Sequence, residues 1–211
     1  MLSDIELNIL RGFFPRPRQR LLPVIQRGIS YPVHEVYPAL KTLQERGVVE
    51  EVWIRSGTAY TLLPEKEEAA EGYLFYAKLR LHEFEKRYGA AAERVENFLR
   101  DSENAQESDI LLVCGSYARG NAEEEDPVTI VRIAVLADQT GQDEPGDTED
   151  VQNAPEESAS LDGIKIVVMW TKELKEMKKS DPETFRDIVN HCFPVKGAKL
   201  FYNLVYLAIG V

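Results

Sequence analysis

Residues 30–62 read SYPVHEVYPALKTLQERGVVEEVWIRSGTAYTL, and this stretch decides the fold of the N-terminal third of the chain. Its first half repeats apolar residues at the spacing that places them on one face of a helix. These residues are Val33, Val36, Leu40 and Leu43. Ser30 stands where a helix N-cap is expected, and Gly47 follows the last apolar position as a stop. The pattern therefore predicts a helix from Ser30 to about Arg46 with one buried face.

The second half of the stretch predicts a β-hairpin. Residues 48–54 have the composition of a strand, residues 55–58 that of a turn, and residues 59–62 that of a returning strand. Trp53 and, much later in the chain, Trp170 each lie in a strand pattern. We expect both tryptophans in the core.

Two further helices are expected before this stretch. Residues 4–14 have helical spacing with Ser3 or Asp4 as the cap, and Pro15 ends the pattern. A short helix at residues 19–26 ends at Gly28. Three helices followed by a hairpin is the order of a winged helix-turn-helix, which we predict for residues 1–63.

A helix-turn-helix protein lays its second motif helix in the major groove of DNA, and a wing contacts the neighbouring backbone. Candidate contacts come from the residues before the second helix, from the exposed face of the third helix and from the wing tip. The predicted DNA-binding residues are Arg16, Arg18, Arg20, His34, Tyr37, Lys41, Arg55, Ser56 and Thr58. The sequence thus predicts double-stranded DNA as a partner.

Residues 36–49, which include Tyr37-Pro38-Ala39-Leu40 and Gly47-Val48-Val49, resemble the recognition-helix segment of PadR-type winged-helix regulators. The resemblance implies a DNA-binding transcriptional regulator. The wing departs from that family because it is shorter and less basic than usual. The alternative is a winged helix that makes only protein contacts, and the acidic residues Glu35 and Glu45 in the recognition helix keep it open.

The charge of the chain is unevenly distributed. The 211 residues carry a formal net charge of −11, yet residues 1–63 hold eight basic against six acidic residues, a charge of +2 that leaves −13 for the rest. Only the first part is therefore suited to face phosphate. The acidity of the whole chain means that non-specific contacts with DNA add little to the affinity. We therefore expect specific DNA binding to be salt-sensitive.

The N-terminus lacks the layout of a signal peptide, and no apolar run is long enough to cross a membrane. We therefore expect a cytoplasmic protein without a membrane partner. Cys114 and Cys192 are too few for a disulfide framework or a four-cysteine zinc site. Both have apolar neighbours, so we expect buried thiols. We expect neither a bound metal nor a cofactor.

Residues 64–104 predict a long helix from Glu65 to about Arg100, with an interruption near Gly89. Its apolar surface exceeds what one small domain needs, so it is a candidate linker and dimer seam. Paired half-sites on DNA favour a homodimer.

Residues 105–211 predict a second domain of the α+β class. Strands are expected at 109–114, 128–136 and 163–170, and helices at 171–179 and 182–191. Residues 137–160 are polar and acidic, and we expect them to form a disordered loop. Residues 111–122, with Gly115-Ser116 after a strand, resemble the signature of minimal nucleotidyltransferases. This resemblance implies a mixed sheet and a helix start that holds a triphosphate.

The metal-binding carboxylates of that family are missing here. Two aspartates two residues apart on a strand share one face and, with a third on a neighbouring strand, hold divalent metals. Pro127, Thr129 and Lys165 occupy these three positions. The sequence therefore predicts an inactive, pseudo-nucleotidyltransferase domain with no catalytic residues.

A phosphate or nucleotide could still bind to Gly115, Ser116, Arg119 and Lys165, whereas the alternative is that Gly115 serves only the turn. The leading hypothesis is a transcriptional regulator whose second domain serves oligomerisation or ligand sensing. A divergent metal-dependent nucleotidyltransferase and an antitoxin-like interaction protein are the alternatives.

Overall fold

The computed structural model describes residues 2–15, 19–100, 109–134, 160–161 and 163–210. The chain forms two compact units: unit 1 comprises Met1–Glu83 with Ala198–Val211, and unit 2 comprises Phe84–Gly197. Each unit combines helices with its own sheet, so the predicted α+β class is confirmed at that level. Within the described residues, no helix is both long and apolar enough to cross a membrane.

Unit 1 begins with α1 (Asp4–Arg11), whose N-terminus is capped as its sequence predicts. The Ser3 side chain accepts a hydrogen bond from the Glu6 N–H, and the Glu6 carboxylate accepts one from the Ser3 N–H at 2.7 Å. This reciprocal capping box satisfies two amides that a helix start leaves without partners. Glu6 is buried and lies 3.7 Å from Arg46, so the cap is also tied to the end of a later helix.

The second predicted helix starts later than expected. Residues 20–21 form a short strand, β1 (Arg20–Leu21), and α2 (Leu22–Arg27) follows with Pro23 in its first turn. Proline is suited to the first turn of a helix because its missing N–H is not needed there. The strand forms because Arg20 and Leu21 pair with Tyr60 and Ala59, which are distant in sequence.

The third helix, α3 (Val33–Glu45), buries Val36, Leu40 and Leu43 as predicted. Two details of the prediction are wrong. The N-cap is Pro32 and makes no side-chain cap bond, so Ser30 is not the cap. Val33 is 58% exposed, because the first turn of α3 extends beyond the apolar core that its later turns cover.

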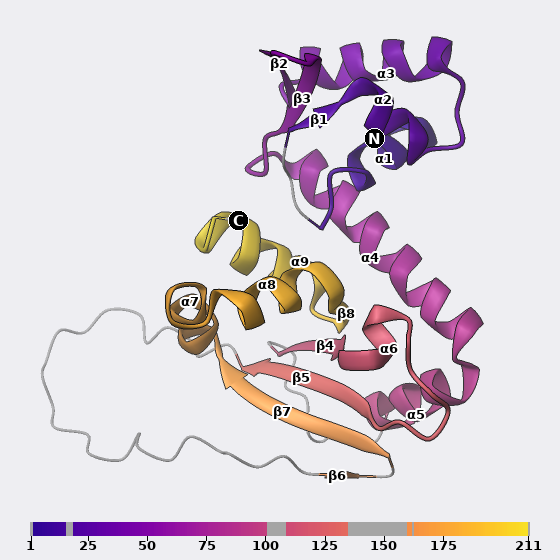
Figure 1. The fold of residues 1–211 in the computed structure, drawn as a ribbon, viewed down its shortest axis with the longest axis vertical. Helices are drawn as coiled ribbons and strands as arrows, with labels where there is room; N and C mark the ends of the chain where they lie inside the picture. The colour runs from indigo at the N-terminus through magenta and orange to yellow at the C-terminus, as the bar shows by residue number, and fades with distance from the viewer. Residues whose placement is uncertain (1, 16–18, 101–108, 135–159, 162, 211) are drawn as a thin grey trace, which may run out of the picture. The chain divides into compact units, whose positions relative to one another are not determined.

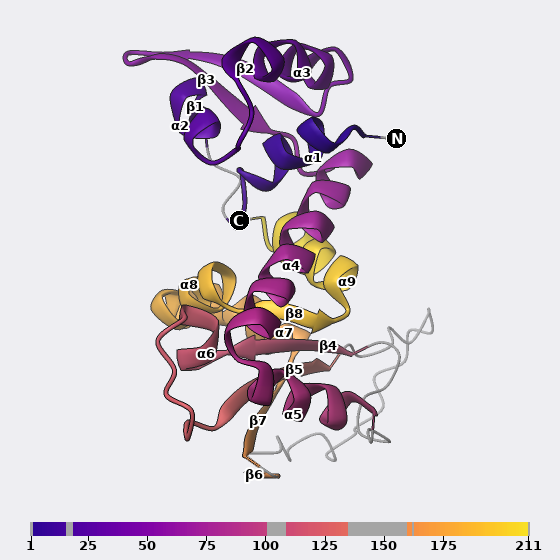
Figure 2. The same ribbon diagram turned by 90° about the vertical axis from the view of Figure 1, so that its right-hand side faces the viewer.

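The predicted hairpin is present as β2 (Val49–Ile54) and β3 (Gly57–Leu62), antiparallel from Val49 opposite Leu62 to Ile54 opposite Gly57. With β1 it forms a three-stranded sheet of order β1-β3-β2. Figure 2 shows the hairpin tip extending past the helices of this unit. Trp53 lies near that tip and is 78% exposed, so its predicted core position is wrong.

Unit 1 is completed by segments from both ends of the chain. The first part of α4 (Glu67–Arg87) packs with α9 (Ala198–Tyr202) and the π-helical turn η1 (Asn203–Ala208) through an aromatic cluster. The rings in contact are Phe14, Tyr73, Tyr76, Phe201, Tyr202 and Tyr206. The hydroxyls of Tyr202 and Tyr206 donate to the carbonyls of Pro64 and Pro15 at 2.5 and 2.6 Å. The C-terminal residues, assigned by sequence to the second domain, therefore pack in unit 1.

The predicted interruption near Gly89 is present, because α4 ends at Arg87 and α5 (Gly89–Arg100) starts after Tyr88. Unit 2 holds α5 and a mixed sheet of order β6-β7-β5-β4-β8, part of which is visible in Figure 1. Its strands are β4 (Ile110–Cys114), β5 (Val128–Ala134), β6 (Ser160–Leu161), β7 (Ile164–Trp170) and β8 (Phe193–Lys196). Only β5 and β7 pair in parallel.

Three helices accompany this sheet: α6 (Gly115–Arg119), α7 (Thr171–Ser180) and α8 (Pro182–His191). Asp181 caps α8 by accepting from the Thr184 N–H at 3.1 Å, and hydrogen bonding with Thr184 lowers the pKa of Asp181. The predicted disordered loop lies outside the described residues except for Ser160 in β6.

The expectation of free thiols is wrong, since Cys114 and Cys192 form a buried disulfide. Cys114 ends β4 and Cys192 immediately precedes β8, whose Phe193 lies opposite Val113 in an antiparallel pair. The two cysteines extend this ladder, with Cα atoms 4.5 Å apart. No local pattern predicts this pairing, because the two cysteines are 78 positions apart.

Candidate functional site

The outward face of α3 carries the residues predicted to read DNA. His34, Tyr37 and Lys41 are exposed, and the Lys41 ammonium lies 5.6 Å from the centre of the Tyr37 ring. His34 lies 3.8 Å from the Glu35 carboxylate, and 81% of its side chain is exposed. These side chains lie on the face opposite the buried Leu40 and Leu43, so α3 presents them to solvent together.

The hairpin tip holds the predicted wing residues. Ile54 pairs with Gly57, which leaves Arg55 and Ser56 as the two residues of the turn, both exposed. Thr58 is half-buried and lies opposite the exposed Trp53. A cation at the end of a projecting hairpin is well placed for a phosphate contact.

The three arginines before the second helix have different positions. Arg16 and Arg18 lie outside the described residues. Arg20 lies in β1 opposite Tyr60, and its Nε is buried with no hydrogen-bond partner in the described part of the chain. Arg20 is therefore part of the sheet and not an open surface cation.

The surface also presents apolar residues that the sequence analysis did not select. Val24 of α2, Val33 and Tyr37 of α3 and Trp53 of β2 are large and exposed. A tryptophan in a strand pattern usually indicates the core, but Trp53 lies near the end of the hairpin, opposite Thr58, and is exposed. Exposed apolar side chains that gather on one surface indicate a contact with another molecule.

The residues predicted to hold phosphate in unit 2 lie around the end of β4. Gly115 begins α6 with a φ of 73°, and a Cβ added to it would lie 3.3 Å from the Thr129 hydroxyl oxygen. Glycine is the residue that adopts this backbone conformation without strain. Gly115 therefore has a structural role, in line with the alternative that it serves the turn.

Thr129 and Lys165 stand directly opposite each other on the parallel strands β5 and β7. Cys114 is opposite Thr129 on its other side, so the three residues form one row across the sheet. Pro127 is exposed just before β5. Throughout the described residues, no group of three His, Cys, Asp or Glu side chains is placed to hold a metal ion.

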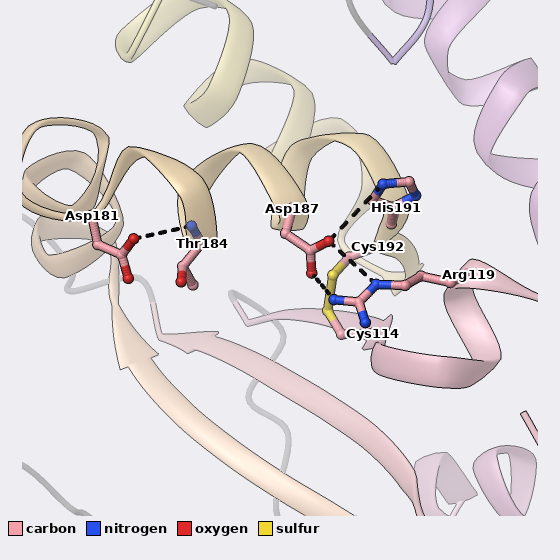
Figure 3. Close-up of polar contacts among 7 residues, drawn as sticks. All are labelled: Cys114, Arg119, Asp181, Thr184, Asp187, His191 and Cys192. Carbon is pink, nitrogen blue, oxygen red and sulfur yellow. Dashed lines mark hydrogen bonds and ion pairs between the residues drawn. A yellow bond between two sulfur atoms is a disulfide. The ribbon is translucent and has the colours of Figure 1, made fainter. Parts of the chain in front are cut away.

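Arg119, the remaining predicted phosphate ligand, is already paired. Figure 3 shows its guanidinium against Asp187 of α8, with distances of 3.3 Å from Nε and 2.7 Å from Nη2. His191 approaches the same carboxylate at 4.0 Å. The hydrogen bond from Arg119 to Asp187 raises the pKa of the guanidinium, which stays charged. A bidentate arginine–carboxylate pair competes with phosphate for the same donors.

Two of the four residues predicted to bind phosphate are thus engaged elsewhere, Gly115 in the turn against Thr129 and Arg119 in the pair with Asp187. Ser116 and Arg119 belong to α6, whereas Lys165 is exposed on β7. The charge expected to replace a metal is therefore split between a paired arginine and a solvated lysine.

Comparison with known proteins gives no relative. No protein-family model matches the chain, and no curated protein or solved structure does so either.

Proposed function

We propose that unit 1 is a winged helix-turn-helix that binds double-stranded DNA through α3 and the β2–β3 hairpin, and that the protein is a transcriptional regulator. One observation carries the proposal: α3 buries one face and presents His34, Tyr37 and Lys41 on the other, beside a projecting hairpin tipped by Arg55. An exposed helix next to a wing is the arrangement that winged-helix proteins use to reach groove and backbone.

The sheet order adds support. A short strand between the first two helices pairs with the second hairpin strand, in the order β1-β3-β2. The balance of charge supports the same assignment, because residues 1–63 are net basic in a chain of net charge −11. Unit 2, similar in motif to nucleotidyltransferases but without their carboxylates, would serve oligomerisation or ligand sensing, and the regulator would act as a homodimer.

The proposal is tested by titrating the full-length protein with DNA from upstream of its own gene and with a scrambled duplex. Fluorescence anisotropy of labelled DNA gives the affinities at several salt concentrations. We expect tighter binding to the upstream DNA, and a loss of about tenfold or more in Lys41→Glu and in Arg55→Glu. Lys78→Glu is the matched control, because Lys78 is exposed on α4 away from α3 and the hairpin.

Trp53 supplies a second readout in the same experiment. With Trp170 replaced by Phe, the fluorescence comes from the hairpin alone, since the chain has only two tryptophans. DNA bound at the wing should change the emission of this exposed ring, and Arg55→Glu should abolish the change. Equal affinity for both duplexes in all variants, or no binding at moderate salt, would refute the proposal.

A second candidate function is supported by the exposed apolar residues. A surface that only binds DNA does not require large exposed apolar side chains. The exposed residues Val24, Val33, Tyr37 and Trp53 therefore favour a protein contact of the antitoxin type. Val33→Ser and Trp53→Ser variants separate the two functions. They would disrupt a protein complex detected by co-purification, whereas loss of DNA affinity without a co-purified partner favours the regulator.

A further inference from the structure

Unit 2 contains a cavity that the motif analysis did not predict. It has a volume of about 270 Å³ and lies where α4 ends and α5 begins. The first turn of α5, Arg87, Tyr88, Arg94, Tyr117 and Glu124 form its main lining. All of these residues belong to unit 2, and none is among the residues predicted to bind phosphate.

Two arginines face this cavity without a carboxylate partner. Arg94 donates to the Tyr117 hydroxyl at 3.2 Å, and the Arg87 guanidinium lies 5.2 Å from the centre of the Tyr88 ring. Neither arginine forms an ion pair within the described residues. Each guanidinium carries five N–H donors, so most of these donors are free to bind an anion.

Tyr117 holds Arg94 in place from the inside. Its hydroxyl lies 3.1 Å from the Glu123 carbonyl and 3.2 Å from the Asp126 carbonyl, so its proton is directed at the backbone. The hydroxyl oxygen is left to accept from Arg94. This arrangement orients the guanidinium before any ligand arrives, which lowers the entropy lost on binding.

Tyr88 forms part of the wall of the cavity. Its hydroxyl is buried and has no hydrogen-bond partner in the described part of the protein. A buried hydroxyl without a partner destabilises a folded protein by about 1–3 kcal/mol, so such groups are rare. Because this hydroxyl has almost no accessible surface, it does not reach the cavity, and Tyr88 contributes its ring to the lining.

The start of α5 contributes backbone donors. Gly89, Ala90 and Ala91 line the cavity, and the first turn of this 12-residue helix contains no acidic side chain. Amides in the first turn of a helix have no acceptor within the helix and favour anions. The two arginines and these amides therefore present donors of the same electrostatic sign.

Neighbouring glycines leave room for the arginines. A Cβ added at Gly163 would lie 2.6 Å from Nη1 of Arg94, and one added at Gly120 would lie 3.0 Å from Nη1 of Arg87. Both guanidiniums thus lie close to bare backbone, at positions that a larger residue would obstruct.

We propose that this cavity binds a small phosphate monoester, with its phosphate oxygens on Arg87 and Arg94. The volume lies just below the roughly 300–1,000 Å³ of ordinary ligand pockets, which favours a small metabolite over a dinucleotide. Glu124 adds a carboxylate to the lining, so the rest of the ligand carries hydroxyl or amino donors. This inference does not depend on DNA binding by unit 1.

The test is calorimetric titration of the full-length protein with inorganic phosphate, glycerol phosphate and glycerol. We expect both phosphate compounds to bind and glycerol, which lacks the anion, not to bind. Arg87→Gln and Arg94→Gln should each weaken glycerol phosphate binding by about tenfold or more, because each removes charged hydrogen bonds. Arg100→Gln is the matched control, since Arg100 lies on α5 but pairs with Glu96 in solvent.

Arg119→Gln distinguishes the cavity from the end of β4. If the ligand binds in the cavity, this substitution should not change the titration. Failure of both phosphate compounds to bind at millimolar concentration, or binding that only Arg119→Gln abolishes, would overturn the proposal.

Discussion

The surface of α3 and the hairpin differs from the end of β4 in what its predicted site residues do. His34, Tyr37, Lys41 and Arg55 face solvent, and Arg55 and Lys41 have no carboxylate partner in the described residues. At the end of β4, Arg119 is paired with Asp187 and Gly115 lies against Thr129. The contrast teaches that a motif residue is available to a ligand only where the fold leaves its polar atoms unpaired.

The same contrast extends to the two units as a whole. Unit 1 is held by an aromatic cluster that joins the two ends of the chain, whereas unit 2 is held by a five-stranded sheet and a disulfide. We therefore expect changes in one unit to leave the other folded. Trp53 in unit 1 and Trp170 in unit 2 let the two unfolding transitions be followed separately in single-tryptophan variants.

The largest expected effect comes from Tyr73→Ala in unit 1. Tyr73 is buried at the centre of the aromatic cluster, with ring centres 5.2–6.4 Å from those of Phe14 and Phe201. Replacing a buried aromatic by alanine costs about 3–5 kcal/mol of the free energy of unfolding. Circular dichroism and single-tryptophan fluorescence should show the loss in unit 1. Leu74→Ala, at a partly exposed neighbouring position, should cost far less; equal losses would contradict the assigned packing.

Reduction of the disulfide should destabilise unit 2 alone. The bond joins residues 78 positions apart, and removing a cross-link over such a loop typically costs about 2–4 kcal/mol. Thermal unfolding monitored at Trp170 in a Trp53→Phe variant should shift to lower temperature when a dithiol is added. The double variant Cys114→Ala/Cys192→Ala should unfold at a lower temperature than the intact protein, and the reductant should not change its unfolding temperature. An unchanged transition in the intact protein would show that the cysteines are not bonded in solution.

Alkaline pH should destabilise unit 1 selectively. Burial raises the pKa of Tyr73, Tyr202 and Tyr206 above the ordinary tyrosine value of 10.0. Their contribution is fully present below that value, and it is lost as pH rises through the higher folded pKa values because the unfolded chain ionises first. The free energy of unfolding should fall by up to about 1.4 kcal/mol per pH unit for each tyrosine above pH 10.

Tyrosinate absorbance during a pH titration measures this effect. Ionisation of the three phenols should coincide with loss of helical signal from unit 1. Tyr202→Phe cannot ionise at that position, so its stability should decline less steeply with pH than that of the intact protein. Three tyrosines that titrate near the ordinary value in the folded protein would contradict their burial.

The smallest expected effect is at the Arg119–Asp187 pair. Both side chains are partly exposed, at 48% and 36%, so solvent screens their attraction. A double-mutant cycle with Arg119→Gln and Asp187→Asn should give a coupling of about 0.2–1 kcal/mol that weakens at high salt. No coupling at low salt would mean that Arg119 is free in solution. That result would support the hypothesis that Arg119 binds phosphate at the end of β4.

Much of the local structure follows from the sequence alone. The Ser3 cap of α1, the buried face of α3, the hairpin, the break before α5 and the helices α7 and α8 all lie where spacing or composition predicts them. These features depend on residues a few positions apart, and the periods of helix and strand make such patterns readable. Ser30 and β1 are the exceptions: α3 starts at Val33 with Pro32 as its N-cap, and β1 forms by pairing with distant residues.

Only the tertiary structure decided which residues meet. The Cys114–Cys192 bond, the packing of Tyr206 in η1 against Tyr73 in α4 and the pairing of Arg119 each join residues far apart in the sequence. The exposure of Trp53 also depends on how the elements are arranged. The cavity lined by Arg87 and Arg94 has the same origin, because α5 and α6 bring unrelated segments to its walls. Local periodicity determines where a side chain points from its own element. Contacts between elements depend on chain closure over long loops, which no local pattern records.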